Sequence, residues 1–287
     1  MLLPEAYAVP NNCAITLAAA LLGLLVGSFL NVVIHRLPKM MQRETANFVA
    51  LERGEALPHA GRYDLLLPRS ACPHCNTRLP AHHNVPILSW LLLRGRCSQC
   101  RAPIGLRYPV VELLGAALFA LAAWKFGAGI TGLAVMCCCA VLVALAFIDA
   151  ETMLLPDALT LPLLWLGLLV NLGHRIAPLP DAVLGAAGGY AALWLIFWAF
   201  KLATGKEGLG YGDFKLMAAL GAWLGWQALP LVLLTASALG AAVGIALVVS
   251  GRHERGQAIP FGPYLAIAGM LALLYGSDWL AFGIYDY

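Results

Sequence analysis

Charged residues are scarce in this chain of 287 residues. Asp, Glu, Lys and Arg make up 11% of the sequence, whereas hydrophobic residues make up 61% and the mean hydropathy is +0.79. A soluble domain of this length carries roughly twice that share of charged residues. The scarcity excludes an ordinary soluble protein and predicts an all-α polytopic membrane protein.

Basic residues are missing from the beginning of the chain. The first twelve residues contain neither Lys nor Arg, and no small-residue cleavage site follows a basic segment. A secretory signal peptide needs both features. We therefore expect the first apolar segment to be a retained transmembrane helix.

The apolar residues are grouped into segments of spanning length. A transmembrane helix needs about 20 apolar residues, and the run from 214 to 250 is too long for a single crossing. We expect Gly225, Gln227 and Pro230 to break it. We expect about eight transmembrane helices, with seven or nine as the alternatives because the late segments are short. The segments are 13–34, 108–125, 130–148, 155–173, 182–202, 213–228, 230–250 and 259–276.

The distribution of Lys and Arg predicts the orientation. With the N-terminus outside, every Lys and Arg except Lys125 and Arg175 falls on the cytosolic side. Cytosolic loops of membrane proteins carry such an excess of basic residues. This topology predicts a multi-pass protein of the cytoplasmic membrane.

A polar insert, residues 35–107, contains two Cys-x-x-Cys pairs. Four thiolates in two such pairs suit a structural zinc ion in a small ribbon-like insert, whereas the reducing cytosol disfavours disulfides. The alternatives are four free thiols or a redox pair. Nucleic acid is not expected as a partner, because the insert is tethered between membrane helices. The predicted ligands are Cys72, Cys75, Cys97 and Cys100.

Two aspartates stand at the cytosolic ends of apolar segments. Asp149 ends the run 131–148, and Asp213 closes a Gly-Tyr-Gly-Asp turn before another apolar run. Ionisable groups at such positions usually mark a functional site. Two carboxylates that share one proton can act as base toward water and acid toward a peptide carbonyl. Asp157 is the alternative first acid, but it follows Pro156 and is typical of a helix start.

The glycines before Asp213 suggest the form of the substrate. Glycine permits close approach of another backbone, and a cleavable peptide must be extended rather than helical. We expect these glycines to make room for an extended substrate segment beside the acid. An ordinary loop with a helix cap is the alternative interpretation.

These features together resemble the prepilin peptidases, also called type IV leader peptidase/N-methyltransferases, and the resemblance extends nearly from end to end. It includes the two cysteine pairs and Asp149. The other matching segments are 27–38 (GSFLNVVIHRLP), 84–90 (NVPILSW), 107–112 (RYPVVE), 155–157 (LPD), 210–213 (GYGD) and 260–263 (PFGP).

The resemblance implies two reactions. It implies that the enzyme removes the basic leader of type IV prepilins and of type II secretion pseudopilins, and then methylates the new N-terminal residue with S-adenosylmethionine. It assigns catalysis to Asp149 and Asp213, and zinc binding to the four cysteines. It also implies a bacterial inner-membrane protein, embedded in lipid, whose active site faces the cytoplasm.

The methyl-transfer site is less defined than the peptidase site. No glycine-rich strand–turn–helix signature of a soluble adenosylmethionine domain occurs in the sequence. Glu112 could attract the sulfonium or the new amine, although a helix cap or an ion pair with Arg107 explains it equally well. We therefore expect an N-terminal helix (1–34), a zinc-binding insert linked to methyl transfer (35–107) and a peptidase core (108–287). Nothing in the sequence predicts an oligomeric state.

Three other classes of protein remain as alternatives. Presenilin-type and signal-peptide-peptidase-type aspartyl proteases share a Gly-x-Gly-Asp acid, but they lack a four-cysteine insert. A proton-coupled transporter would show inverted repeats, and the sequence shows no repeat. A non-enzymatic assembly scaffold would give the glycines beside Asp213 no purpose.

Overall fold

The computed structural model describes residues 13–72, 74–78, 80, 85–206, 208–251 and 259–280. Pro73 and Asn84, which belong to the sequence motifs, lie outside these residues. The described residues form helices and no strands, as predicted, apart from two isolated β-bridges. The chain divides into two compact units, Met1–Ala128 and Gly129–Tyr287, and each unit is described by itself.

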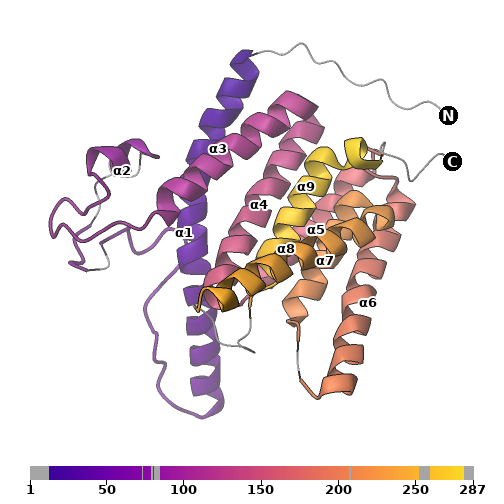
Figure 1. Ribbon diagram of the computed structural model, residues 1–287. Coiled ribbons are helices and arrows are strands. Elements are labelled where there is room, and N and C mark those ends of the chain that lie inside the picture. The colour runs from indigo at the N-terminus through magenta and orange to yellow at the C-terminus, as the bar shows by residue number, and fades with distance from the viewer. Residues whose placement is uncertain are drawn as a thin grey trace. The chain divides into compact units, whose positions relative to one another are not determined.

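Figure 1 shows the helices of both units. The N-terminal unit contains α1 (Cys13–Glu52), α2 (Leu88–Leu92) and α3 (Arg107–Phe126). The C-terminal unit contains α4 (Ile130–Thr152), α5 (Asp157–Asn171), α6 (Leu179–Thr204), α7 (Tyr211–Leu224), α8 (Leu229–Val249) and α9 (Gly262–Leu280). The helix from Arg107 thus lies in the N-terminal unit, whereas the sequence placed it with the peptidase core.

Five described helices are long and apolar enough to cross a membrane. They are α1, α3, α4, α6 and the stretch Trp226–Val249 that includes α8. Apolar segments of α5 and α9 are shorter, and α7 has 14 residues. The expected count of eight spans is therefore not confirmed by length and composition. The predicted break after the sixth span is confirmed, because α7 ends at Leu224 and α8 begins at Leu229.

The first helix is longer than the predicted span. We expected the span to end at residue 34, but α1 continues through Pro38 to Glu52. Half of residues 39–52 are polar, and the segment contains many good helix formers, such as Met, Gln, Arg, Ala and Glu. Hydropathy therefore marked the end of the apolar segment rather than the end of the helix.

Helices α1 and α3 pack with their backbones in near contact. A Cβ atom on Gly23 would lie 2.4 Å from the carbonyl oxygen of Gly115, and one on Gly27 would lie 2.7 Å from the Cα atom of Glu112. Small residues four apart permit such contact between membrane helices. We call this line of contact the α1–α3 seam.

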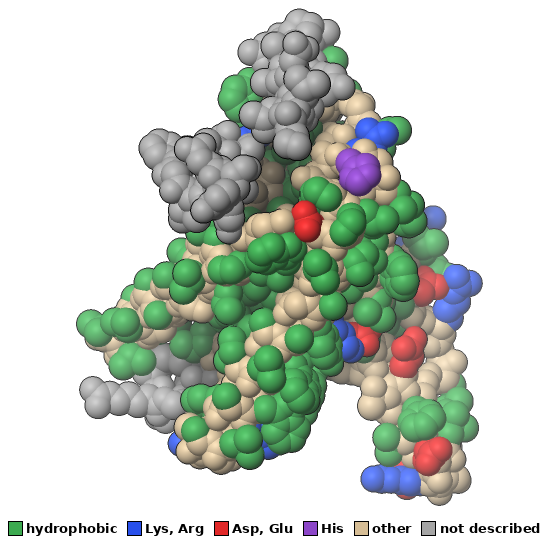
Figure 2. Space-filling model, turned by 90° about the vertical axis from the view of Figure 1, so that its right-hand side faces the viewer, with side chains coloured by type: hydrophobic (Ala, Val, Ile, Leu, Met, Phe, Trp, Pro, Cys, Tyr) green, Lys and Arg blue, Asp and Glu red, His purple; other side chains and the backbone are tan. Residues whose placement is uncertain are grey.

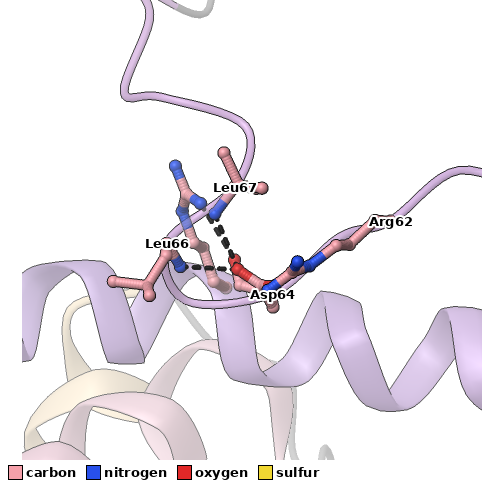
Figure 3. Close-up of polar contacts among 5 residues, drawn as sticks. Arg62, Asp64, Leu66 and Leu67 are labelled. Carbon is pink, nitrogen blue, oxygen red and sulfur yellow. Dashed lines mark hydrogen bonds and ion pairs between the residues drawn. The ribbon is translucent and has the colours of Figure 1, made fainter.

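A loop of the polar insert is fastened to the extension of α1. Arg36 donates a hydrogen bond from its guanidinium to the carbonyl oxygen of Asp64 (2.9 Å). The Asp64 carboxylate accepts hydrogen bonds from the N–H groups of Leu66 and Leu67 and from Arg62 (Figure 3). The Leu67 N–H first, and then Arg62, hold the pKa of Asp64 below its usual value. The turn is thus ordered locally and then attached to the helix.

The C-terminal unit is built around α7. Its side chains from Leu216 to Trp223 are all buried, and α7 packs against α5, α6 and α9. Gly185 of α6 and Gly221 of α7 touch through their backbones, since a Cβ on Gly185 would lie 2.4 Å from the Gly221 oxygen. Hydrophobic side chains cover much of the surface drawn in colour in Figure 2, as a lipid environment requires.

A pair of glycines on α6 tests this packing. We expect Gly185→Ala to destabilise the protein by about 1–3 kcal/mol, because overpacking forces the helices apart. Gly188→Ala is the matched control, since a Cβ there meets nothing within 4 Å, and it should change stability by less than about 0.5 kcal/mol. Thermal unfolding in detergent measures both variants. Equal Tm values for the two would contradict the close approach of α6 and α7.

Candidate active site and metal centre

Asp149 lies in the last turn of α4. Its side chain is buried, and its Oδ2 atom accepts a hydrogen bond from the N–H group of Gly262 (2.9 Å). Gly262 is the first residue of α9, where N–H groups lack partners within the helix and favour a negative group. The carboxylate at the end of one helix therefore faces the beginning of another.

Asp213 lies in the first turn of α7. It is as buried as Asp149, and its Oδ2 atom accepts a hydrogen bond from the N–H group of Gly210 (3.1 Å). Its Oδ1 atom is buried without a hydrogen-bond partner among the described residues. A buried carboxylate oxygen without a partner is costly and calls for a functional explanation.

The two carboxyl groups lie close enough for their charges to interact. Each group uses its Oδ2 atom to accept one backbone N–H, from Gly262 or from Gly210. Two like charges in one buried place favour a state in which one carboxyl keeps its proton. The structure thus brings the two sequence-predicted acids together within the C-terminal unit.

Asp157, the alternative acid, lies in a different environment. Both of its carboxylate oxygens lie 2.7 Å from the Nζ atom of Lys215, and the side chain is 53% exposed. Asp157 is thus a solvated partner in an ion pair, whereas Asp149 is buried beside Asp213. The choice of Asp149 as the catalytic acid remains a prediction.

The glycines before Asp213 have packing roles. A Cβ on Gly212 would lie 2.7 Å from the Cβ of Leu155, so this position is filled by the segment that leads into α5. Gly210 is the N-cap residue of α7 and donates to Asp213. The glycines therefore help to position the acid, and their making room for an extended substrate segment remains a prediction.

The four insert cysteines lie together in two matching turns. In each turn the backbone of the first cysteine pairs with the residues that follow the second cysteine. Cys72 donates to the Thr77 oxygen (3.0 Å), and Cys97 donates to the Ala102 oxygen (2.9 Å). The residues after the second cysteines, Asn76 and Arg101, both have positive φ.

The four sulfur atoms form a compact cluster. All lie within 4.8 Å of one another, with 3.8 Å between Cys72 and Cys100 and 4.0 Å between Cys75 and Cys97. Such a cluster could hold a metal ion. The predicted set of ligand residues is thus brought together.

The sulfur atoms differ in their electrostatic surroundings. The hydroxyl and N–H groups of Thr77 lower the pKa of Cys75 to about 6, and the N–H groups of Cys100 and Gln99 lower that of Cys97. The Ala102 N–H also lowers the pKa of Cys100, but burial and the neighbouring sulfurs raise it to about 11. Four thiolates therefore need a cation among them.

Glu112 lies in the N-terminal unit, on α3. Its side chain is buried, and its Oε2 atom accepts a hydrogen bond from the N–H group of Ile87 (2.8 Å). The Ser28 hydroxyl donates a second hydrogen bond to the carboxylate. The sequence offered a cap or an ion pair with Arg107, and the two hydrogen bonds described here come from the insert and from α1.

Sequence reasoning assigned no role to Gly262, Ile87 or Asn31. Gly262 belongs to the Pro-Phe-Gly-Pro segment, which was noted for its resemblance. Ile87 and Asn31 belong to segments that were noted for their resemblance alone. Gly262 and Ile87 each contribute a backbone N–H group, and Asn31 contributes a side-chain amide. The residue type alone does not reveal that such a group has a role.

Two family models match the chain. One, described as the bacterial peptidase A24 N-terminal domain, matches residues 21–126, and the other, the type IV leader peptidase family, matches residues 136–245. Relatives named "Prepilin leader peptidase/N-methyltransferase" are similar over most of their length. The chain is 57% identical to the Aeromonas hydrophila protein over 263 residues, 90% of each chain.

The chain belongs to the type IV leader peptidase family. It is therefore an enzyme, and the predicted resemblance is confirmed. Family members of the same name include the Stutzerimonas stutzeri protein, 51% identical over 96% of each chain. The Pseudomonas aeruginosa member is 52% identical over 95% of this chain and 94% of its own. No solved structure matches the chain.

The contact between Asp149 and Gly262 can be tested in this leader peptidase. A Cβ on Gly262 would lie 2.6 Å from the Asp149 Oδ2 atom. We expect Gly262→Ala to displace the carboxylate and to lower kcat/KM for leader cleavage about 100-fold, the loss typical of a misplacement of about 1 Å. Gly276→Ala on the same helix is the control, because a Cβ there meets nothing within 4 Å. Similar activity in both variants would refute the role of Gly262.

Proposed function

We propose that this enzyme removes the leader peptide of type IV prepilins and pseudopilins with Asp149 and Asp213, and that it then N-methylates the new N-terminus. One observation carries the peptidase assignment: two buried carboxyl groups interact in one apolar unit. The name of the relatives supports both activities.

The carboxyl pair suits hydrolysis of a peptide bond. With one proton between them, the ionised group takes a proton from water while the protonated group donates its proton to the scissile carbonyl oxygen. The backbone N–H group of Gly262 donates a hydrogen bond to the Oδ2 atom of Asp149, and that of Gly210 donates one to the Oδ2 atom of Asp213. The Oδ1 atom of Asp213 is left to meet water or substrate.

The pair lies at the membrane boundary in the proposed topology. Lys201, Lys206 and Lys215 are close in sequence to Asp213, and the positive-inside rule assigns them to the cytoplasm. In this arrangement α5, α7 and α9 complete eight crossings as shorter helices of the bacterial inner membrane. A prepilin has a basic leader and an apolar helix, so its scissile bond would lie at the same boundary.

We propose that the cysteine cluster binds a structural zinc ion. Four sulfurs about 2.3 Å from a tetrahedral zinc ion lie about 3.8 Å apart. The separations of 3.8 Å between Cys72 and Cys100 and 4.0 Å between Cys75 and Cys97 support this ion. A four-cysteine site has no open position, so the ion would order the insert rather than catalyse.

Methyl transfer is assigned to the N-terminal unit. The family model for this part of the chain covers residues 21–126, separately from the peptidase model. S-adenosylmethionine is the proposed methyl donor. Glu112 is the proposed contact for a positive group of the donor or acceptor, because its carboxylate is buried beside neutral partners.

Substitution of the acids tests the peptidase assignment. Asp149→Asn or Asp213→Asn should lower kcat/KM for leader removal by about 100- to 10,000-fold, the contribution typical of a general acid or base. The control is Asp157→Asn, which breaks only an exposed ion pair worth about 0–1 kcal/mol. Cleavage of a purified prepilin is measured in detergent. Full activity in either variant, or its loss only in Asp157→Asn, would reject the assignment.

Substitution of the cysteines tests the zinc assignment. Cys72→Ser combined with Cys75→Ser should remove about one equivalent of zinc per chain, because two of four ligands are lost. Metal analysis of the purified protein measures this, and Cys13→Ser, which changes an exposed thiol of α1, is the control. Zinc content that is unchanged in the double variant would exclude this cluster as the zinc site.

A further inference from the structure

A second group of buried polar side chains lies on the α1–α3 seam. Asn31 of α1 is 3% exposed and Glu112 of α3 is 7% exposed, and both helices are apolar enough to span a membrane. The Asn31 amide donates to the carbonyl oxygen of Tyr108 (3.1 Å), one turn before Glu112 on α3. One turn before Asn31, the Gly27 backbone touches that of Glu112. The two side chains therefore occupy neighbouring turns of one seam.

The amide of Asn31 is only half used. Its Nδ2 group donates to the carbonyl oxygens of Gly27 (3.3 Å) and Tyr108, whereas its Oδ1 atom is buried without a hydrogen-bond partner among the described residues. Because two carbonyl oxygens face the Nδ2 position, rotation of the amide would only bring acceptor against acceptor. The unused atom is thus an acceptor that lacks a donor.

The buried Asn171 of the C-terminal unit shows what a structural amide looks like in this chain. Its Nδ2 group donates to Ala222 and Trp223, and its Oδ1 atom accepts from Ile176 and Ala177. Every hydrogen-bonding position of Asn171 has a use within the fold. The open oxygen of Asn31 is therefore not explained by helix packing.

The carboxylate of Glu112 adds negative charge to this place. The groups that the structure puts on it, the Ile87 N–H and the Ser28 hydroxyl, are both neutral donors. Ser28 lies three residues before Asn31, so both project from the same face of α1. Ile87 has φ +59°, a conformation that β-branched residues rarely adopt, so the backbone of the insert is held in a costly form beside the carboxylate.

A buried carboxylate and an open amide oxygen together select a cation with N–H groups. We propose that Glu112 and Asn31 bind the free α-amino group of the cleaved substrate, the nitrogen that receives the methyl group. This inference rests on the proposed methyltransferase function. An ammonium can donate one hydrogen bond to the Asn31 Oδ1 atom and another to the carboxylate, and the charge of Glu112 is then balanced.

The same pair suits the chemistry of the acceptor. The ammonium first gives one proton to the Glu112 carboxylate, which frees the nitrogen lone pair. The lone pair then forms a bond to the methyl carbon of the sulfonium donor, while the carbon–sulfur bond breaks and its electrons stay on sulfur. The products are a secondary ammonium and a neutral thioether, so charge and protons balance.

Binding of two matched peptides tests the proposal without peptidase activity. The probes are a peptide that begins with a free-amine Phe followed by an apolar helix segment, and the same peptide with an acetylated N-terminus. The purified full-length enzyme should bind the free-amine peptide at least about 10-fold more tightly, the value of one hydrogen bond to a charged group. In Glu112→Gln and in Asn31→Leu this preference should fall to about one.

Several outcomes would overturn the proposal. In the first, the wild-type enzyme binds the two peptides equally. In the second, Glu112→Gln still binds the free-amine peptide more tightly. In the third, that variant loses S-adenosylmethionine binding while it keeps the preference for the free-amine peptide. Asn31→Leu keeps the test decisive if Glu112→Gln does not fold, as judged by its Tm. Glu55→Gln, which changes an exposed carboxylate of the insert, is the matched control. The wild-type enzyme could methylate the peptide while the variants still bind the free-amine peptide more tightly than the acetylated one. In that case the inference fails while the proposed function stands.

Discussion

The burial of two interacting carboxyl groups in an apolar unit constrains the rest of the structure. A carboxylate away from water is unfavourable unless its oxygens are hydrogen-bonded. The C-terminal unit supplies backbone N–H groups for this purpose, from Gly210 before α7 and from Gly262 at the start of α9. Backbone donors are fixed by the helices themselves, and among the described hydrogen bonds both acids are held by backbone N–H groups. Glycine is needed at 262 because a side chain there would occupy the place of the carboxylate.

The polar chemistry of the N-terminal unit follows a similar rule. Helices α1 and α3 meet through glycines, and polar groups lie where the backbones are closest. Asn31 and Glu112 are held there by carbonyl oxygens, an N–H group and a hydroxyl. The Ile87 N–H comes from the insert that also carries the cysteine cluster. In both units, the buried polar side chains lie where helices pack closely, and backbone groups orient these side chains through hydrogen bonds.

Much of this organisation is visible in the sequence. Hydropathy located the helices, and residue type identified Asp149, Asp213 and the four cysteines, because acids and paired thiols are conspicuous in an apolar chain. The sequence did not show that α1 extends to Glu52, since a helix can continue after its apolar segment ends. It did not reveal the donors Gly262 and Ile87, because a backbone N–H exists at almost every position. It also did not show that Leu155 packs against Gly212, because this contact joins residues far apart in the sequence.

We propose that Asp149 and Asp213 work as a single pair with one shared proton. The most direct measurement is kcat/KM for leader cleavage as a function of pH, with purified enzyme and a prepilin whose own ionisation is controlled. We expect a bell-shaped profile, because activity is lost when the pair gains a second proton and again when it loses the first. A rate that rises with pH to a plateau, as for one carboxylate acting alone, would contradict it.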